Sequence, residues 1–84
     1  MRYFAQINIL PRAELLDPKG KTTEIALRGL GFSNVHNVRI GKHITLELEA
    51  VSLEEASEQV EKMAQQLLAN LVIENYEIQL KPSY

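Results

Sequence analysis

The stretch Val35-His-Asn-Val-Arg-Ile-Gly-Lys-His-Ile-Thr-Leu-Glu-Leu-Glu49 decides how the chain is expected to fold. Apolar and polar residues alternate along it on both sides of a break at Gly41 and Lys42. Such alternation is typical of half-buried strands, because successive side chains leave a strand on opposite faces. A glycine that opens a two-residue link supplies the positive φ that a hairpin turn needs. The stretch therefore predicts a β-hairpin with its turn at Gly41-Lys42.

The residues before this hairpin predict a strand followed by a helix. Apolar and polar residues alternate over residues 2–9, and Pro11 ends the strand because it lacks a backbone donor. Asp17 is suited to cap a helix, Pro18 to occupy its first position, and Gly31 to end it in the left-handed conformation. The expected inner stripe of this helix is Thr23, Ala26, Leu27 and Leu30.

A second helix and a last strand are expected after the hairpin. Ser52 and Glu55 have the spacing of a capping box. Residues 73–80 alternate again, which predicts a strand. The apolar face of the second helix is expected to consist of Leu53, Ala56, Val60, Met63, Ala64, Leu67 and Leu68.

The predicted order of elements is β-α-β-β-α-β, the α+β ferredoxin-like (split βαβ) plan, in one domain of residues 1–84. Right-handed crossovers place both helices on one face of an antiparallel sheet. A chain of 84 residues has a thin core, for which self-association is a common remedy. We therefore expect a homo-oligomer, most simply a homodimer, joined through a sheet edge or the open face of the sheet.

Charge and composition exclude several classes of partner. The net charge is −2, whereas nucleic-acid binding normally shows as a strong basic excess. The chain has no cysteine, which excludes disulfides and thiol chemistry. No apolar run approaches the ~20 residues of a membrane span, and the N-terminus lacks a signal segment. The expectation is a cytoplasmic protein that binds neither nucleic acid nor membrane.

No catalytic or metal-binding set emerges from the residues. His36 and His43 lack metal-ligand spacing to any carboxylate pair, and the serines have no histidine and carboxylate around them at readable spacing. Arg12 lies where a phosphate-binding loop would need it, but Glu14 would repel phosphate. A free-standing regulatory domain that binds a small ligand such as an amino acid stays open, because it needs no strict motif.

Four phrases, taken together and in order, resemble the PurS family, the small subunit of phosphoribosylformylglycinamidine (FGAM) synthase. They are Leu16-Asp-Pro-Lys-Gly-Lys21, Leu30-Gly-Phe32, Val38-Arg-Ile-Gly-Lys42 and Leu68-Ala-Asn-Leu-Val-Ile-Glu-Asn-Tyr76. The resemblance covers nearly the whole chain. Three positions depart from the family pattern: Lys19 stands where glutamine is usual, Leu71 where proline is usual, and Asn75 where aspartate is usual.

The resemblance implies a role in purine biosynthesis without chemistry on this chain. Such a synthase makes formylglycinamidine ribonucleotide from formylglycinamide ribonucleotide, ATP and glutamine. A glutaminase subunit releases ammonia, and a large synthetase subunit uses it together with ATP and magnesium. The small subunit is implied to bridge the two and to assist ammonia transfer. It is expected to carry no cofactor, no metal and no catalytic residue.

The partner-binding candidates come from the first helix and the hairpin. Asp17, Pro18 and Gly20 serve equally well as a helix cap and a close packing point, and Gly41 is first a turn residue. Arg39 and Lys42 have no structural task that the sequence reveals, so they are the stronger candidates for contact with another subunit. The predicted partner site is therefore Asp17, Pro18, Gly20, Arg39, Gly41 and Lys42.

Overall fold

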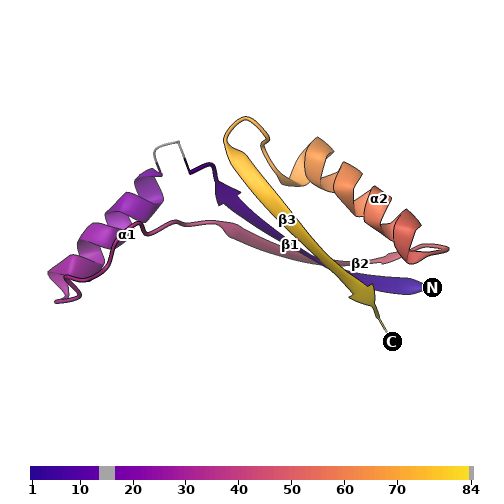
Figure 1. The fold of residues 1–84 in the computed structure, drawn as a ribbon, viewed down its shortest axis with the longest axis horizontal. Coiled ribbons are helices and arrows are strands. Elements are labelled where there is room, and N and C mark those ends of the chain that lie inside the picture. Colours follow the sequence, from indigo (N-terminus) through magenta and orange to yellow (C-terminus); the bar gives the residue numbers. More distant parts are fainter. Residues whose placement is uncertain (14–16, 84) are drawn as a thin grey trace.

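The computed structural model describes residues 1–13 and 17–83, in which one antiparallel sheet has the strand order β2-β1-β3 (Figure 1). The central strand β1 (Arg2–Pro11) pairs with β2 (Lys42–Glu49) on one side and with β3 (Glu74–Pro82) on the other. Ile7 lies opposite Ile44 and Ile78 in this register. The predicted α+β class with an antiparallel sheet and two helices is confirmed.

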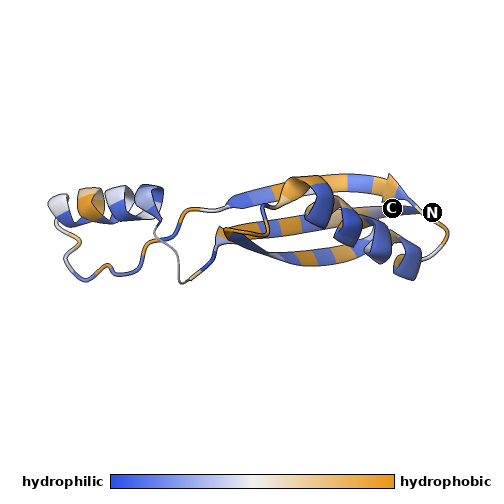
Figure 2. Ribbon diagram, turned by 90° about the horizontal axis from the view of Figure 1, so that it is seen from above, coloured by the Kyte–Doolittle hydropathy of each residue, from blue (hydrophilic) through white to orange (hydrophobic). Residues whose placement is uncertain are grey.

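The core lies on one face of the sheet, under helix α2 (Leu53–Met63). Ser52 caps this helix as predicted, because its Oγ accepts a hydrogen bond from the amide of Glu55 at 3.2 Å. A π-helical turn, η1 (Ala64–Leu68), continues α2. Apolar and polar positions alternate along the strands, as Figure 2 shows, so that one face of the sheet is apolar. The buried residues of this core are Tyr3, Ala5, Ile7, Ile9, Ala50, Ala56, Val60, Ala64 and Ala69.

The inner row of β2 is less well covered than that of β1. Helix α2 packs chiefly on β3 and β1. Ile44, Leu46 and Leu48 of β2 point to the same face as the core but are only half-buried. This row, the β2 shelf, is therefore an apolar strip beside α2.

Helix α1 (Pro18–Gly29) lies beyond one end of the sheet rather than on its face (Figures 1 and 2). The prediction that both helices cover one face is therefore wrong. Gly31 ends α1 as predicted, with φ of 104°. The Gly31 amide donates to Arg28 O and the Phe32 amide to Leu27 O, which is a Schellman motif.

The expected inner stripe of α1 is only partly right. Thr23 and Leu27 are half-buried, but Ala26 and Leu30 are exposed. Gly20 is the residue of α1 that is buried. The helix therefore faces the residues that return from it to β2, not the core of the sheet.

The predicted hairpin at Gly41-Lys42 is wrong: residues 35–41 have no regular secondary structure, and β2 begins only at Lys42. Asn37 takes a left-handed φ of 56°, which interrupts a strand. The amides of Val38 and Ile40 donate to side chains of α1 or its cap rather than to a neighbouring strand. We call α1 with this returning segment, residues 17–41, the arm.

The arm makes the molecule long and thin. Its extents are 51 × 29 × 14 Å, and the Cα radius of gyration is 16.4 Å. A compact domain of this length has a radius of gyration of about 12 Å. The chain therefore has an outlying part that a single core does not cover.

Candidate partner-binding site

Asp17 joins the start of α1 to the returning segment. Its Oδ1 accepts a hydrogen bond from the Gly20 amide at 3.1 Å, and its Oδ2 accepts one from the Ile40 amide at 3.0 Å. These two amides, Ile40 first, and the nearby charge of Arg39 hold the pKa of Asp17 below its ordinary value of 3.8. One carboxylate thus caps the helix and fixes the segment beside it.

Gly20 lets the helix and the segment approach closely. A Cβ at this position would lie 2.2 Å from the carbonyl oxygen of Val38 and 2.6 Å from Oδ2 of Asp17. Backbone cannot give way as a flexible side chain can, so only glycine fits. Gly29 differs, because a Cβ there would meet nothing within 4 Å.

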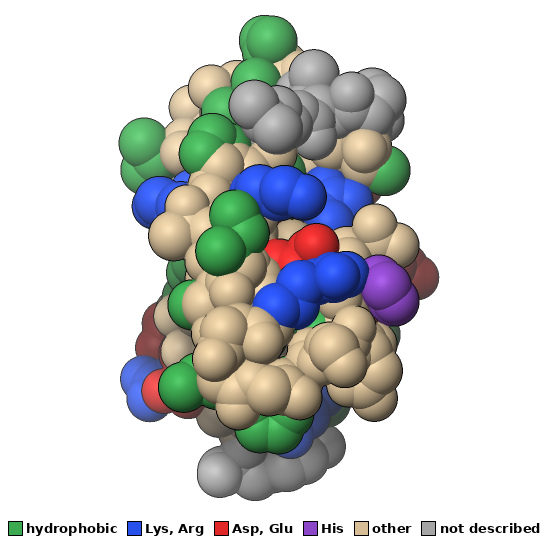
Figure 3. Space-filling model, turned by 90° about the vertical axis from the view of Figure 1, so that its left-hand side faces the viewer, with side chains coloured by type: hydrophobic (Ala, Val, Ile, Leu, Met, Phe, Trp, Pro, Cys, Tyr) green, Lys and Arg blue, Asp and Glu red, His purple; other side chains and the backbone are tan. Residues whose placement is uncertain are grey.

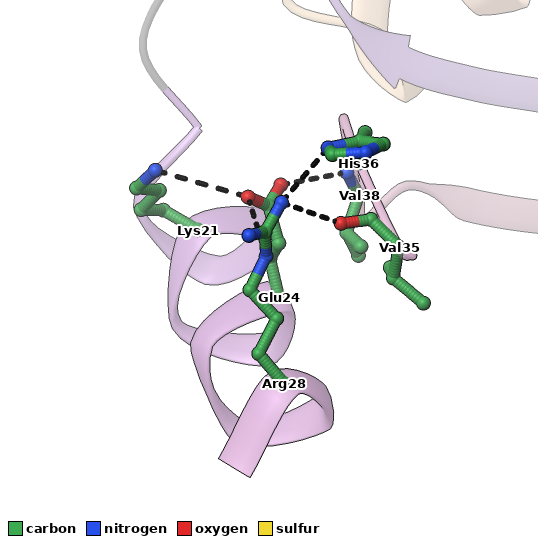
Figure 4. A network of polar contacts seen from close by, with 6 residues as sticks. All are labelled: Lys21, Glu24, Arg28, Val35, His36 and Val38. Carbon is green, nitrogen blue, oxygen red and sulfur yellow. Dashed lines mark hydrogen bonds and ion pairs between the residues drawn. The ribbon is translucent and has the colours of Figure 1, made fainter. Parts of the chain in front are cut away.

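Glu24 is a functional residue of the arm that sequence reasoning missed. Its Oε1 accepts from the Val38 amide at 3.3 Å, and its Oε2 lies 3.8 Å from Lys21 Nζ and 3.7 Å from Arg28 Nε (Figure 4). The Val38 amide, and then the two cations, lower the pKa of Glu24 from its ordinary value of 4.5. Its spacing of seven from Asp17 and four from Gly20, which puts all three on one helix face, was the available signal.

Arg39 and Lys42 have structural tasks, contrary to the expectation. The Arg39 guanidinium donates to the carbonyl oxygen of Pro11 at the end of β1. Lys42 Nζ donates to Leu68 O at 3.4 Å and lies 3.8 Å from Glu74 Oε2. Both cations therefore hold the arm and the start of β2 against the rest of the chain.

The six predicted residues come together where the arm meets the sheet. Four of them, Asp17, Pro18, Gly41 and Lys42, line a groove of about 620 Å³. Gly41 is not a hairpin turn; a Cβ there would lie 2.2 Å from Ile9 O. The structure therefore brings the predicted residues together but gives Gly41, Arg39 and Lys42 local structural tasks that the sequence did not reveal.

The end of the molecule that the arm forms is rich in charged side chains. Viewed end-on, Lys and Arg side chains lie on both sides of acidic ones, beside a histidine (Figure 3). Arg28 Nη2 donates to Val35 O at 2.8 Å and lies 2.8 Å from His36 Nδ1 (Figure 4). These contacts fix the tip of α1 on the returning segment.

Among residues 1–13 and 17–83, no three His, Cys, Asp or Glu side chains are placed to hold a metal ion. Within the same ranges, no helix is long and apolar enough to cross a membrane. The polar groups of the arm bond to backbone and to one another, within a small α+β chain of one antiparallel sheet and two helices.

The sequence pattern of one family, described as "PurS: Phosphoribosylformylglycinamidine (FGAM) synthase", matches residues 4–82. The chain belongs to this family. It is 47% identical to PurS of Synechocystis over 74 residues, which are 88% of this chain and 74% of that protein. It is 40% identical to PurS of Methanocaldococcus jannaschii over 79 residues, 94% of this chain and 95% of that protein.

Solved structures of the family have the same fold. The PurS structure from Bacillus subtilis in a C2 crystal form matches with a TM-score of 0.87 at 32% identity, covering 95% of this chain and 99% of that one. A chain of the structure described as PurLQS from Thermotoga maritima matches with a TM-score of 0.89 at 37% identity, covering 96% and 99%. The displaced arm therefore lies within a fold that experimental structures share.

The two glycines of α1 make a matched test of the arm. Gly20→Ala should loosen the returning segment, because its Cβ would collide with Val38 O. Gly29→Ala should instead stabilise the helix by up to about 1 kcal/mol, since alanine is the better helix former and meets open space. Amide hydrogen exchange at Val38 and Ile40 should accelerate in the first variant only. Equal exchange in both variants would contradict the close approach.

Acid should release the returning segment. Folding lowers the pKa of Asp17 and of Glu24. Their contribution to the stability of the folded arm is therefore fully present above the ordinary pKa values of 3.8 and 4.5, and it is lost as the pH falls through the lower pKa values of the folded state. NMR shifts of the Ile40 and Val38 amides should therefore titrate below those values. Asp17→Asn should abolish the Ile40 transition and retain that of Val38. Midpoints at or above the ordinary values would refute the two hydrogen bonds.

Proposed function

We propose that this chain is a non-catalytic accessory subunit of an FGAM synthase complex in purine biosynthesis. The observation that carries the proposal is the likeness, over 96% of the chain, to a chain of the structure described as PurLQS from Thermotoga maritima. Curated relatives at 47% and 40% identity are named as subunits of the same synthase. A surface built from hydrogen-bonded backbone and ion pairs supports a role in assembly.

In this proposal the partners are the glutaminase and the large synthetase subunits. The chain bridges them and assists the transfer of ammonia from one to the other. ATP and Mg²⁺ bind on the synthetase, and this chain holds no cofactor. A cytoplasmic location belongs to the proposal, since the curated relatives are subunits of a biosynthetic enzyme.

The proposal includes a homo-oligomer, most simply a dimer. The chain exposes 6081 Å², whereas a compact monomer of 9.5 kDa exposes about 5,000 Å². The excess is close to the ~800 Å² that each partner buries in an interface of standard size. The half-buried β2 shelf supplies apolar surface of the kind such an interface needs.

A small-ligand-binding regulatory domain is the second candidate function. The groove of about 620 Å³ between the arm and the sheet is the feature that favours it, because ligand pockets fall in this size range. Calorimetric titration with amino acids and nucleotides distinguishes the two candidates. Saturable binding to the chain without partner subunits would favour this second function.

Reconstitution tests the main proposal. The chain alone should hydrolyse neither glutamine nor ATP. Adding it to the glutaminase and synthetase should raise glutamine-dependent FGAM synthesis by roughly tenfold or more. Synthesis from ammonium chloride should respond much less, because free ammonia needs no transfer between subunits. Full glutamine-dependent activity without the chain would overturn the proposal.

Light scattering tests the oligomer. At micromolar concentration the mass should be at least twice the 9.5 kDa of one chain. Leu46→Glu on the β2 shelf should shift the mass toward one chain if the copies meet there, since it would place a charge in an apolar contact. Thr45→Glu, at the next position on the opposite face, is the matched control. A mass of one chain for the unmodified protein would rule out the homo-oligomer.

A further inference from the structure

One face of α1 has no partner in the described chain. The helix turns its buried Gly20 and its Glu24 toward the returning segment. The opposite side, which we call the outer face of α1, is exposed throughout. Its centre consists of Thr22, Ile25 and Gly29, and it is flanked by Lys21 and Arg28, which also contact Glu24 and, for Arg28, the returning segment.

This outer face has the composition of a protein interface. Ile25 is 61% exposed and occupies its centre, with Lys21 and Arg28 within about one turn on either side. Thr22 and Gly29 are small and project little from the helix, and a Cβ at Gly29 would meet open space. An apolar centre with a charged rim, reached closely because neighbouring side chains are small, is typical of protein–protein contacts.

The outer face is also held rigidly. The Schellman motif at Gly31 ends the helix, and Arg28 Nη2 donates to Val35 O at 2.8 Å. Glu24 lies between the two cations, at 3.8 Å from Lys21 Nζ and 3.7 Å from Arg28 Nε. A partner would therefore meet a preorganised surface and lose little conformational entropy on binding.

The charge of the arm indicates which kind of partner surface would fit it. Residues 17–41, the arm, contain four of the nine Lys and Arg residues of the chain but only two of its eleven Asp and Glu residues. The arm is thus cationic although the chain as a whole carries −2. Complementary potentials steer association, so an acidic surface is the fitting partner.

We propose that the outer face of α1 is the docking surface for a non-identical protein subunit that presents an apolar contact with an acidic rim. This inference rests on the proposed function, and it assigns the assembly contact to one face of one helix. Two copies that met through this face about a two-fold axis would bring their Lys21 and Arg28 side chains together, which repulsion disfavours. The embedded Glu24 and the acidic net charge disfavour a nucleic acid.

The test compares two exposed apolar residues under the same substitution. Ile25→Glu places a negative charge at the centre of the outer face, and Leu67→Glu places one on η1, where the side chain is 83% exposed. Binding to immobilised synthetase and glutaminase subunits is measured by interferometry. Ile25→Glu should weaken binding to one of them by roughly tenfold or more, the scale of an interface hot spot. Leu67→Glu should bind like the unmodified chain.

A second pair tests the charge. Lys21→Gln should slow association and flatten its salt dependence, whereas Lys62→Gln on α2 should do neither. Light scattering and thermal melting accompany every variant, and neither the mass nor the melting temperature should change for Ile25→Glu.

Each outcome has one meaning. Unchanged binding of Ile25→Glu, or equal loss in Leu67→Glu, overturns the docking surface while leaving the accessory function intact. A changed mass for Ile25→Glu shows that a second copy occupies the face, and this also overturns the proposal. Failure of the unmodified chain to bind either subunit refutes the accessory function itself.

Discussion

The position of the arm depends on two carboxylates that bind backbone amides. Asp17 accepts a hydrogen bond from the amide of Ile40, and Glu24 accepts one from the amide of Val38. The returning segment is therefore bonded to side chains of the helix and its cap, where a strand would be bonded to the backbone of a neighbouring strand. Extended backbone needs partners for its amides, and here the helix supplies them through side chains. The close contact at Gly20 makes this possible, because any larger residue would hold the two elements apart.

This constraint divides the molecule into a core and an extension with different sources of stability. The core is held by ladders on both sides of β1 and by α2 over a row of buried residues such as Ile7, Ile9 and Val60. The arm buries little and relies on polar bonds that water also reaches, which contribute modestly to the free energy of folding. An extension of this kind is better suited to meeting another chain than to stabilising its own.

The sequence predicted the elements that local chemistry determines. Alternation located β1, β2 and β3; Ser52 and Gly31 marked helix boundaries correctly. The hairpin failed because alternation reports only that a segment is extended, and the same pattern suits a segment whose amides bond to a helix. The structure brings the six predicted partner-site residues to one junction. The structural tasks of Arg39 and Lys42 could not be predicted, because the carbonyl groups that they bind come from Pro11 and Leu68, which are distant in sequence.

Arg12 links the end of β1 to the turn before β3. Its guanidinium donates to the carbonyl oxygen of Leu71 through Nε at 3.1 Å and Nη2 at 2.6 Å, and its amide donates to Ile73 O at 2.8 Å. The neighbouring residue, Pro11, is the one whose carbonyl Arg39 binds. Hydrogen bonds thus connect the arm to the end of β1, and the end of β1 to the turn before β3. A rotation of the arm about the end of β1 would therefore also displace the connection before β3 that carries Leu71.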